Sequence, residues 1–261
     1  MSDFNQIVAA WKKRNINSVE ALDAALSNYR ILFAYHSNRI ENAGLSVHQT
    51  REIFENGKVI NYTGDLRTLF ETSNQKECYD FLREYIVKKV PVTPELICQV
   101  HGILTHGCYN ESRWNQGERP GEYKKHYYGV GDDAGAAPED VEEEIQALCG
   151  ELQEAEAKAD SYENILSIAA YFHLSFENIH AFADGNGRVG RTLMNYILIM
   201  HGMPPVIIYD EDRETYYMSL AVFDKTGQID GFVRFMKEEC EKTWIKETPV
   251  RSRHKGKMIC L

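Results

Sequence analysis

One short segment gathers residue types that can do chemistry together. Between residues 180 and 191 the chain carries a histidine, an aspartate, an asparagine, two arginines and three glycines: His180, Asp184, Gly185, Asn186, Gly187, Arg188, Gly190 and Arg191. A histidine can take a proton near neutral pH, and an aspartate is a hard oxygen ligand for a phosphate-bound Mg²⁺. Two arginines three residues apart share one helix face and suit phosphate oxygens. The combination predicts transfer of a phosphorus group from a nucleotide to a hydroxyl.

Two other interpretations of this segment compete with that one. Gly185, Gly187 and Gly190 also fit the G-x-G-x-x-G pattern of dinucleotide-binding folds, but that pattern requires a strand leading directly into the glycines. The residues before it follow a helical pattern instead, so we reject this interpretation. A single histidine or arginine would be a helix cap or a surface charge, whereas five polar groups on one loop favour a site.

The segment must be positioned by the helices predicted on both sides of it. Apolar residues recur at helical spacing over 161–179 and again from Leu193 to Met200, so a polar loop joins two buried helices. Further helices are predicted over residues 18–43, from a capping box at Ser46 to Gly57, over 66–88, from Thr93 to about His106, and from Pro138 onward.

Residues 113–137 are the least helical part of the chain. Glycines alternate there with Tyr123, Tyr127, Tyr128 and Val130, which favours a short β-hairpin. The predicted fold class is therefore all-α, a helical bundle with one β-hairpin flap at about 117–131.

Composition excludes several classes of protein. The 261 residues carry 29 Lys and Arg against 39 Asp and Glu, a net charge of −10, which argues against a nucleic-acid partner bound through a basic face. No run of 18 apolar residues and no signal pattern occurs, so no membrane partner is expected and a cytoplasmic location is predicted. The six cysteines form no C-x-x-C pair, which excludes a common zinc-site spacing.

The segment 180–191 resembles the signature of the Fic family, H-x-F-x-[DE]-G-N-G-R-x-x-R. All eight specified positions match, and Ala181 stands where the family often has proline. The intact Gly185-Asn186-Gly187 is similar to the adenylyl-transferring branch. The resemblance implies a Fic fold and a protein adenylyltransferase that transfers AMP from ATP to a Tyr, Thr or Ser hydroxyl.

The resemblance also implies a role for each residue of the segment. His180 would deprotonate the target hydroxyl, and Asp184 would hold Mg²⁺ or Mn²⁺ at the α- and β-phosphates. Arg191 would reach the γ-phosphate. The residues implied to cradle the other phosphates are Gly185, Asn186, Gly187 and Arg188, with Phe182 as a buried anchor.

Two further parts of the family's site have counterparts outside the segment. The stretch Gly121 to Val130 is similar to the flap that docks the target protein, through Tyr123, Tyr127, Tyr128 and Val130, although Lys124 stands where the family commonly has arginine. The stretch 213–220 resembles a helix that lines the adenine pocket, with Tyr217 and Asp224 as base contacts. A core role for these tyrosines is an equally good interpretation.

Residues 37–42 resemble an inhibitory motif, [ST]-x-x-x-E-[GN], of the same family. Ser37 and Glu41 are four apart, on one face of the predicted helix. The resemblance implies that Glu41 pairs with Arg191 and occupies the γ-phosphate position. In some relatives the same glutamate supports removal of AMP from a modified target.

These observations define the expected organisation and partners. We expect N-terminal helices with the inhibitory motif over 1–60, a catalytic core over 61–245 and a basic tail over 246–261. The expected partners are a target protein, the chain itself as an acceptor, and a second copy, because dimers are common in the family. The alternative from another class is a nucleotide-binding regulatory module without turnover.

Overall fold

The computed structural model describes residues 3–41, 44–59, 62–128 and 135–245. Within these ranges the regular structure is entirely helical and no strand occurs, which confirms the predicted all-α class. In chain order the elements are α1 Asp3–Lys12, α2 Val19–Ala25, α3 Tyr29–Glu41, α4 Val47–Asn56, α5 Leu66–Lys88, α6 Pro94–Leu104, α7 Glu111–Asn115, α8 Val141–Lys158, α9 Tyr162–Ile179, α10 Asn186–Met200, the 3₁₀ turn η1 Asp210–Asp212, α11 Arg213–Thr226 and α12 Asp230–Trp244.

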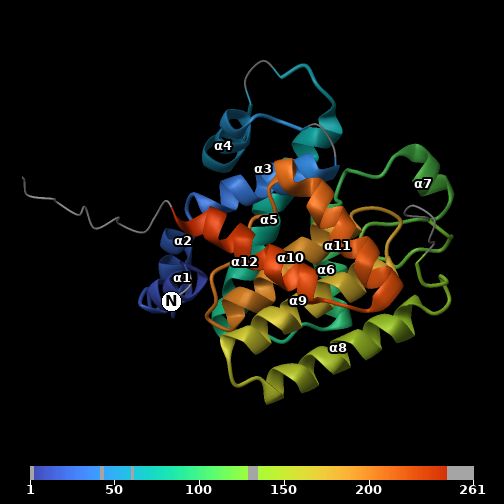
Figure 1. Ribbon diagram of the computed structural model, residues 1–261. Coiled ribbons are helices and arrows are strands. Elements are labelled where there is room, and N and C mark those ends of the chain that lie inside the picture. Colours follow the sequence, from blue (N-terminus) through green and yellow to red (C-terminus); the bar gives the residue numbers. More distant parts are fainter. Residues whose placement is uncertain (1–2, 42–43, 60–61, 129–134, 246–261) are drawn as a thin grey trace, which may run out of the picture.

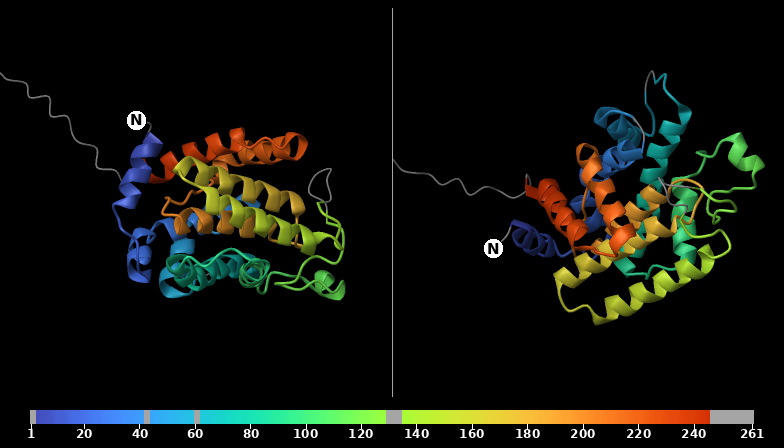
Figure 2. Two further views of the ribbon diagram at one scale, coloured as in Figure 1. Left: turned by 90° about the horizontal axis from the view of Figure 1, so that it is seen from below. Right: turned by 45° about the vertical axis from the view of Figure 1, so that its right-hand side comes forward.

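The antiparallel pair α9 and α10 forms the centre of the molecule (Figure 1). Seen from below, α11 and α12 cover one side of this pair, and α5 and α6 cover the other (Figure 2). Most of α10 is buried, including Leu193, Met194 and Ile197, which are fully covered. A helix surrounded on all sides holds its first turn rigidly, and that first turn belongs to the segment 180–191.

Several predicted helix ends are confirmed by their caps. The Ser46 side chain accepts from the Gln49 N–H, and the Gln49 side chain accepts from the Ser46 N–H at 3.0 Å, a complete capping box before α4. Thr93 caps α6, with Pro94 at its first position. The helix predicted over 66–88 is α5, with the same bounds.

The single helix predicted over 18–43 is wrong in one respect, because it is two helices. Leu26 closes α2 with φ −105° and ψ 9°, and α3 begins afresh at Tyr29. Ser27 and Asn28 stand at the break, and both residue types favour turns over helix interiors. The residues of the inhibitory motif therefore lie on a short separate helix, up to Glu41, while Asn42 lies outside the described residues.

The predicted β-hairpin flap has no strand in its described part, residues 117–128. Gly117 and Gly121 have φ of 83° and 87°, and turns alternate with short irregular pieces on both sides of Pro120. Local side-chain bonds, such as Lys125 Nζ to the Gly117 carbonyl at 2.8 Å, hold these turns in place of a strand ladder. Val130 and the tail 246–261 lie outside the described residues.

Candidate active site

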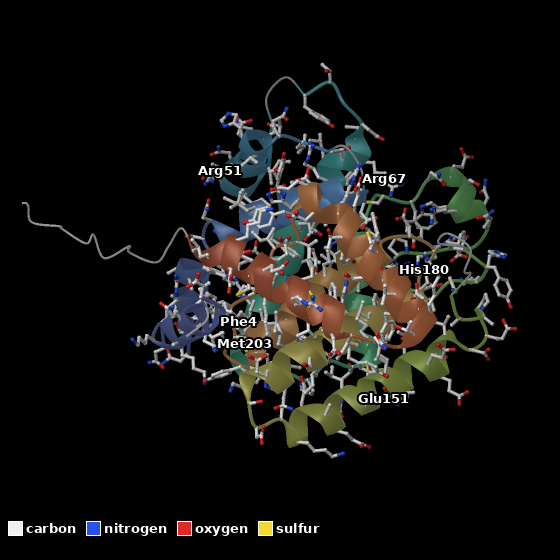
Figure 3. The ribbon with its side chains drawn as sticks, viewed as in Figure 1. Phe4, Arg51, Arg67, Glu151, His180 and Met203 are labelled. Carbon is white, nitrogen blue, oxygen red and sulfur yellow. The ribbon has the colours of Figure 1, made fainter. Side chains whose placement is uncertain are left out.

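His180 lies at the junction of α9 and the polar loop, on the right-hand side of the view in Figure 3. It closes α9 in the left-handed region, φ 51° and ψ 57°, a conformation that costs energy for a residue with a Cβ. Burial, with a smaller effect of the Lys124 charge, lowers the pKa of His180 to about 4. The imidazole is therefore neutral at physiological pH and can accept a proton.

Asn186 holds the loop and orients His180. Its Oδ1 accepts from the Phe182 N–H at 2.9 Å, and its Nδ2 donates to the Phe182 carbonyl at 2.8 Å. The second Nδ2 hydrogen points to His180 Nε2, at 3.2 Å. Because an amide NH₂ only donates, this contact assigns the lone pair of His180 to Nε2. The predicted phosphate contact of this side chain would compete with all three bonds.

Asp184 lies among arginines from three parts of the chain. Its carboxylate is 2.7 Å from Arg67 Nη2 on α5, 3.6 Å from Arg113 Nη2 and 3.5 Å from Arg188 Nη2. Burial would raise the pKa of Asp184, but Arg188, Arg67 and Arg113 together lower it below its usual value. The carboxylate is thus ionised, and in this structure its charge is balanced by these arginines.

The Asp184 carboxylate fits a Mg²⁺ that arrives with a nucleotide, whereas the arginines around it fit phosphate oxygens. Mg²⁺ in phosphate-transfer sites is held by one or two carboxylates, substrate phosphates and water, and Asp184 supplies one carboxylate here. Among the described residues the metal-like cluster is elsewhere, at His36, Asp210 and Glu211. Asp210 there already binds His36 Nδ1 at 2.6 Å and Arg39 Nε at 2.8 Å, so the cluster is an ion-pair contact.

The first turn of α10 presents an anion site. Gly185 has φ 86°, which lets the chain turn into the helix directly after Asp184. At Gly187 a Cβ would lie 2.8 Å from Arg191 Nη1 and would overlap the Glu41 carboxylate. The missing side chain therefore leaves space for an oxygen anion beside the positive end of the helix, and Glu41 fills it.

Arg191 is the point at which the inhibitory motif meets the loop. Its guanidinium is 1% exposed and binds three acceptors on α3: Ser37 Oγ at 3.1 Å, the Ser37 carbonyl at 2.9 Å and Glu41 Oε1 at 2.7 Å. The ring of Tyr216 lies 5.8 Å away on another side. Residues 150 positions apart in the sequence thus form one ion pair, in which Arg191 is buried and Glu41 is partly exposed.

The flap contacts the loop on one side of His180, and the segment that follows the flap contacts the end of α9 on the other side. The Lys124 N–H donates to the Ala181 carbonyl at 2.9 Å, and the Ala136 N–H donates to the Ile179 carbonyl at 3.0 Å. The predicted docking residues differ in their surroundings. Tyr123 is half-buried against Phe182, Tyr128 bonds Glu118 Oε1 at 3.1 Å, and Tyr127 is 62% exposed.

The two predicted adenine contacts lie near the end of α3 and the end of α9. Tyr217 is 45% exposed, and its hydroxyl donates to the Ile40 carbonyl at 3.2 Å, so it is not a core residue. Asp224 accepts from Asn178 Nδ2 at 3.0 Å. Tyr216, the neighbouring tyrosine, is buried and bonds His173 Nε2 at 2.9 Å.

Sequence reasoning missed His101, which connects α6, the flap and the loop. Its Nδ1 accepts from the Gly121 N–H at 2.8 Å, its Nε2 lies 3.0 Å from the Asp184 carbonyl, and its ring stacks on Phe182 at 3.7 Å. Burial lowers the pKa of His101 to about 3, so it is neutral and donates from Nε2. Nothing in the local sequence pattern indicates these partners, which are 20 and 83 residues away.

The sequence of this chain is similar to those of known proteins. A family model described as Fic/DOC family matches residues 91–198, which include the whole polar loop. Curated proteins named Protein adenylyltransferase Fic, from Nematostella vectensis and Culex quinquefasciatus, are 32% identical over 211 and 244 residues. These alignments cover 80% and 89% of this chain but 46% and 45% of the relatives, so the chain spans about half their length.

Solved structures agree at the level of the fold. A Fic-domain-containing signaling protein from Bacteroides thetaiotaomicron superposes with a TM-score of 0.80 at 22% identity, covering 94% of both chains. Fic-1 from C. elegans superposes with a TM-score of 0.73 at 25% identity, covering 94% of this chain and 70% of that one. On its signature loop, the family-model match and its 32%-identical relatives, this chain contains a Fic/DOC-family domain over residues 91–198.

Proposed function

We propose that this chain is a protein adenylyltransferase whose own residue Glu41 keeps it inactive. The observation that carries the proposal is the contact of Glu41 Oε1 with Arg191 Nη2, at 2.7 Å, directly over Gly187 at the start of α10. A carboxylate at that point neutralises the arginine and repels a phosphate. The names of the curated relatives support AMP transfer as the reaction.

In the proposed reaction a hydroxyl oxygen of the target attacks the α-phosphorus of ATP. The bond from that phosphorus to the pyrophosphate oxygen breaks, and the hydroxyl proton passes to His180 Nε2, which gives up its contact with Asn186 Nδ2 to receive it. A pKa of about 4 means that this nitrogen is unprotonated above that pH. The attachment of the flap at Ala181, through the Lys124 N–H, favours a target held directly beside His180.

The cations of the site would stabilise the charge on the phosphates. Arg188 is 3% exposed in its side chain, and Arg191 is 1% exposed, so both act where water screens little. Asp184 would hold a Mg²⁺ brought by the nucleotide, and such an ion would supply positive charge for the phosphate oxygens. For that, Asp184 would exchange its contact with Arg67 for the metal.

Glu41 also supports a second reaction of the same class, removal of AMP from a modified target. Its Oε1 binds Arg191, whereas Oε2 makes no hydrogen bond to any residue in the described ranges. The Glu41 side chain is 35% exposed, so water reaches it and Oε2 could orient a molecule for attack. Release of AMP from a pre-modified protein, lost in Glu41→Gln, is the expected evidence for this reaction.

The position of the label in ATP distinguishes adenylyl transfer from kinase activity and from nucleotide binding without turnover. With Mg²⁺ and ATP labelled at the α-phosphorus, we expect Glu41→Gly to label protein strongly and the unchanged chain weakly. Label from the γ-phosphorus would indicate a kinase. ATP binding with no label from either position, in both forms of the chain, would indicate a nucleotide-binding module without turnover.

A further inference from the structure

An open groove runs between α8 and α9. Two hollows of about 450 and 340 Å³ share Leu148 and Glu151 on α8 and Tyr171 on α9, so they form one continuous groove. Ile229, just before α12, lines the first hollow, and Phe223 on α11 lines the second. We call this surface the α8–α9 groove. Each hollow falls within the range of about 300–1,000 Å³ that is typical of ligand pockets.

The walls of the α8–α9 groove expose apolar side chains. Tyr171 is 40% exposed, and Ile168, Phe223 and Ile229 are each partly exposed. The rings of Tyr171 and Phe223 meet edge to face, with their centroids 6.1 Å apart. Covering apolar surface of this kind stabilises a protein by about 25 cal/mol per Å². An occupant with apolar side chains is therefore favoured.

The charged side chains that line the groove are both negative. They are Glu144 and Glu151 on α8, both exposed, and Glu151 is labelled in Figure 3. Within the described ranges, no lysine or arginine lines either hollow. Glu151 Oε2 accepts from the Tyr171 hydroxyl at 3.1 Å, a neutral donor that does not cancel its charge. The matching occupant therefore carries positive charge beside its apolar groups.

One segment of this chain has that composition. Residues 246–261 hold five lysines and arginines, of which four fall between Arg251 and Lys257, against the single acid Glu247. A run of apolar residues, 258–261, follows the basic part. Basic and apolar side chains thus stand next to each other in the segment, as negative and apolar side chains do in the groove.

The segment can reach the groove from the end of α12. Lys237 on α12 binds Glu163 Oε2 at 2.5 Å, and Glu163 is followed by Asn164, which lines the first hollow. Lys237 lies roughly 12 Å along the helix from Ile245, after which the segment begins. A chain extends about 3.3 Å per residue, so residues 246–257 alone span up to about 40 Å.

We propose that residues 246–261 dock in the α8–α9 groove of the same molecule. Their basic side chains would lie beside Glu144 and Glu151, and their apolar residues would cover Tyr171 and Phe223. Docking of this kind gains from both burial of apolar surface and opposite charge.

The docked segment would lie next to the polar loop. The second hollow includes Asn178 and Ile179, the two residues before His180. The groove is nevertheless separate from the residues proposed to bind ATP, so docking does not depend on the proposed AMP transfer.

Zero-length cross-linking of the full chain tests the contact directly. A carbodiimide joins a lysine amine to a carboxylate that touches it, and peptide mass spectrometry identifies the pair. We expect the lysines of residues 255–257 to link to Glu144 or Glu151 at least about fivefold more often than to Glu142 or Glu154. The last two are exposed glutamates of α8 that do not line the groove. High salt should lower the yield, because it screens the charges.

Ile259→Asn combined with Leu261→Asn tests the apolar part of the docking. This double variant keeps every lysine and glutamate, yet its cross-links to the groove should fall at least about fivefold. Thr248→Asn combined with Ser252→Asn is the matched control, because it changes two polar residues of the same segment and should keep the cross-links. Equal yields in the two double variants would mean attraction by charge alone and would overturn the proposal.

A mixture of unlabelled and ¹⁵N-labelled chain distinguishes docking within one molecule from docking on a second copy. We expect both halves of each cross-linked pair to carry the same label. Mixed pairs would assign the groove to the segment of a second copy and overturn the proposal. So would a chain with no cross-links to Glu144 and Glu151, or with as many to Glu142 and Glu154, as expected if the groove receives a partner protein instead.

Discussion

The three hydrogen bonds that Arg191 donates to α3 differ in their consequences. Two go to Ser37, one to the hydroxyl and one to the carbonyl, and the third goes to the Glu41 carboxylate. Only Glu41 brings a charge, and only its carboxylate lies over Gly187 where a phosphate would bind. At the scale of residues, the proposed inhibition would therefore depend on the charge of Glu41, with Ser37 aligning it.

Ser37→Ala should activate the chain weakly. The substitution removes the bond from Arg191 Nε to Ser37 Oγ, 3.1 Å, but leaves the bond to the carbonyl and the pair with Glu41. The loss of one such bond is worth about 1–2 kcal/mol, so AMP transfer should rise roughly 5- to 30-fold and stay below that of Glu41→Gly. Initial rates of label incorporation measure this, and a Ser37→Ala rate equal to that of Glu41→Gly would contradict it.

At the scale of elements, α3 is held by contacts beyond its motif. His36 Nδ1 and Arg39 Nε bind the two oxygens of Asp210 at 2.6 and 2.8 Å, and Asn38 Nδ2 binds Thr72 Oγ1 at 3.2 Å. These contacts fix α3 to η1 and to α5. The position of Glu41 thus depends on the whole helix.

Asp210→Ala should release α3 and activate the chain in part. His36 and Arg39 both lose their partner, while Glu41 keeps its pair with Arg191, so we expect a roughly three- to tenfold rise in AMP transfer. Amide hydrogen exchange in residues 33–41 should become faster. Asp212→Ala is the matched control, since Asp212 binds Lys242 and not α3. Equal activation by both variants would exclude a specific role for the Asp210 contacts.

Local sequence signals predicted the helices, and in part their caps, because those depend on residues close in the chain. The capping box at Ser46 and the proline at the start of α6 are examples. The resemblance supplied His180, Asp184 and Arg191 as the site. Contacts set by packing could not be predicted from the sequence: Arg67, which binds Asp184, is 117 residues away from it. The break at Leu26 was missed because only two turn-favouring residues interrupt an otherwise helical pattern.

At the scale of the whole molecule, net charge and local charge have opposite signs. The chain carries −10, yet Arg67, Arg113, Arg188 and Arg191 converge on the polar loop. An overall acidic protein disfavours a nucleic-acid groove, whereas a few buried arginines are enough for a nucleotide. The same burial shifts several titrating groups, and this affects how stability depends on pH.

Stability should be greatest near pH 6.5. Burial lowers the pKa of His101 and His173 to about 3 and the pKa of His180 to about 4. Between these values and the unfolded pKa of 6.5, the unfolded chain binds three protons that the folded chain does not. The free energy of unfolding therefore falls as pH drops below 6.5. Burial raises the pKa of Glu177 and Glu239 to about 8. The stability that these two glutamates contribute is complete below their unfolded pKa of 4.5 and is lost as pH rises through their folded pKa of about 8.

Thermal melting from pH 4 to pH 9 measures this profile. Between pH 4.5 and 6.5 the three histidines outweigh the two glutamates, so the melting temperature should rise to about pH 6.5 and then decline. Glu177→Gln should flatten the alkaline decline, and Glu139→Gln, at an exposed position, should not. A melting temperature that still rises from pH 7 to pH 9 would contradict the assignment.

The central claim is that Glu41 blocks an otherwise complete adenylyltransferase. Intact-mass spectrometry after incubation with ATP and Mg²⁺ tests it most directly, because it reports the added group and the number of groups together. We predict that Glu41→Gly gains the mass of AMP, that the unchanged chain gains little, and that the double variant Glu41→Gly, His180→Ala gains none. A Glu41→Gly chain that folds, binds ATP and adds AMP neither to itself nor to any protein in a cell extract would contradict the claim.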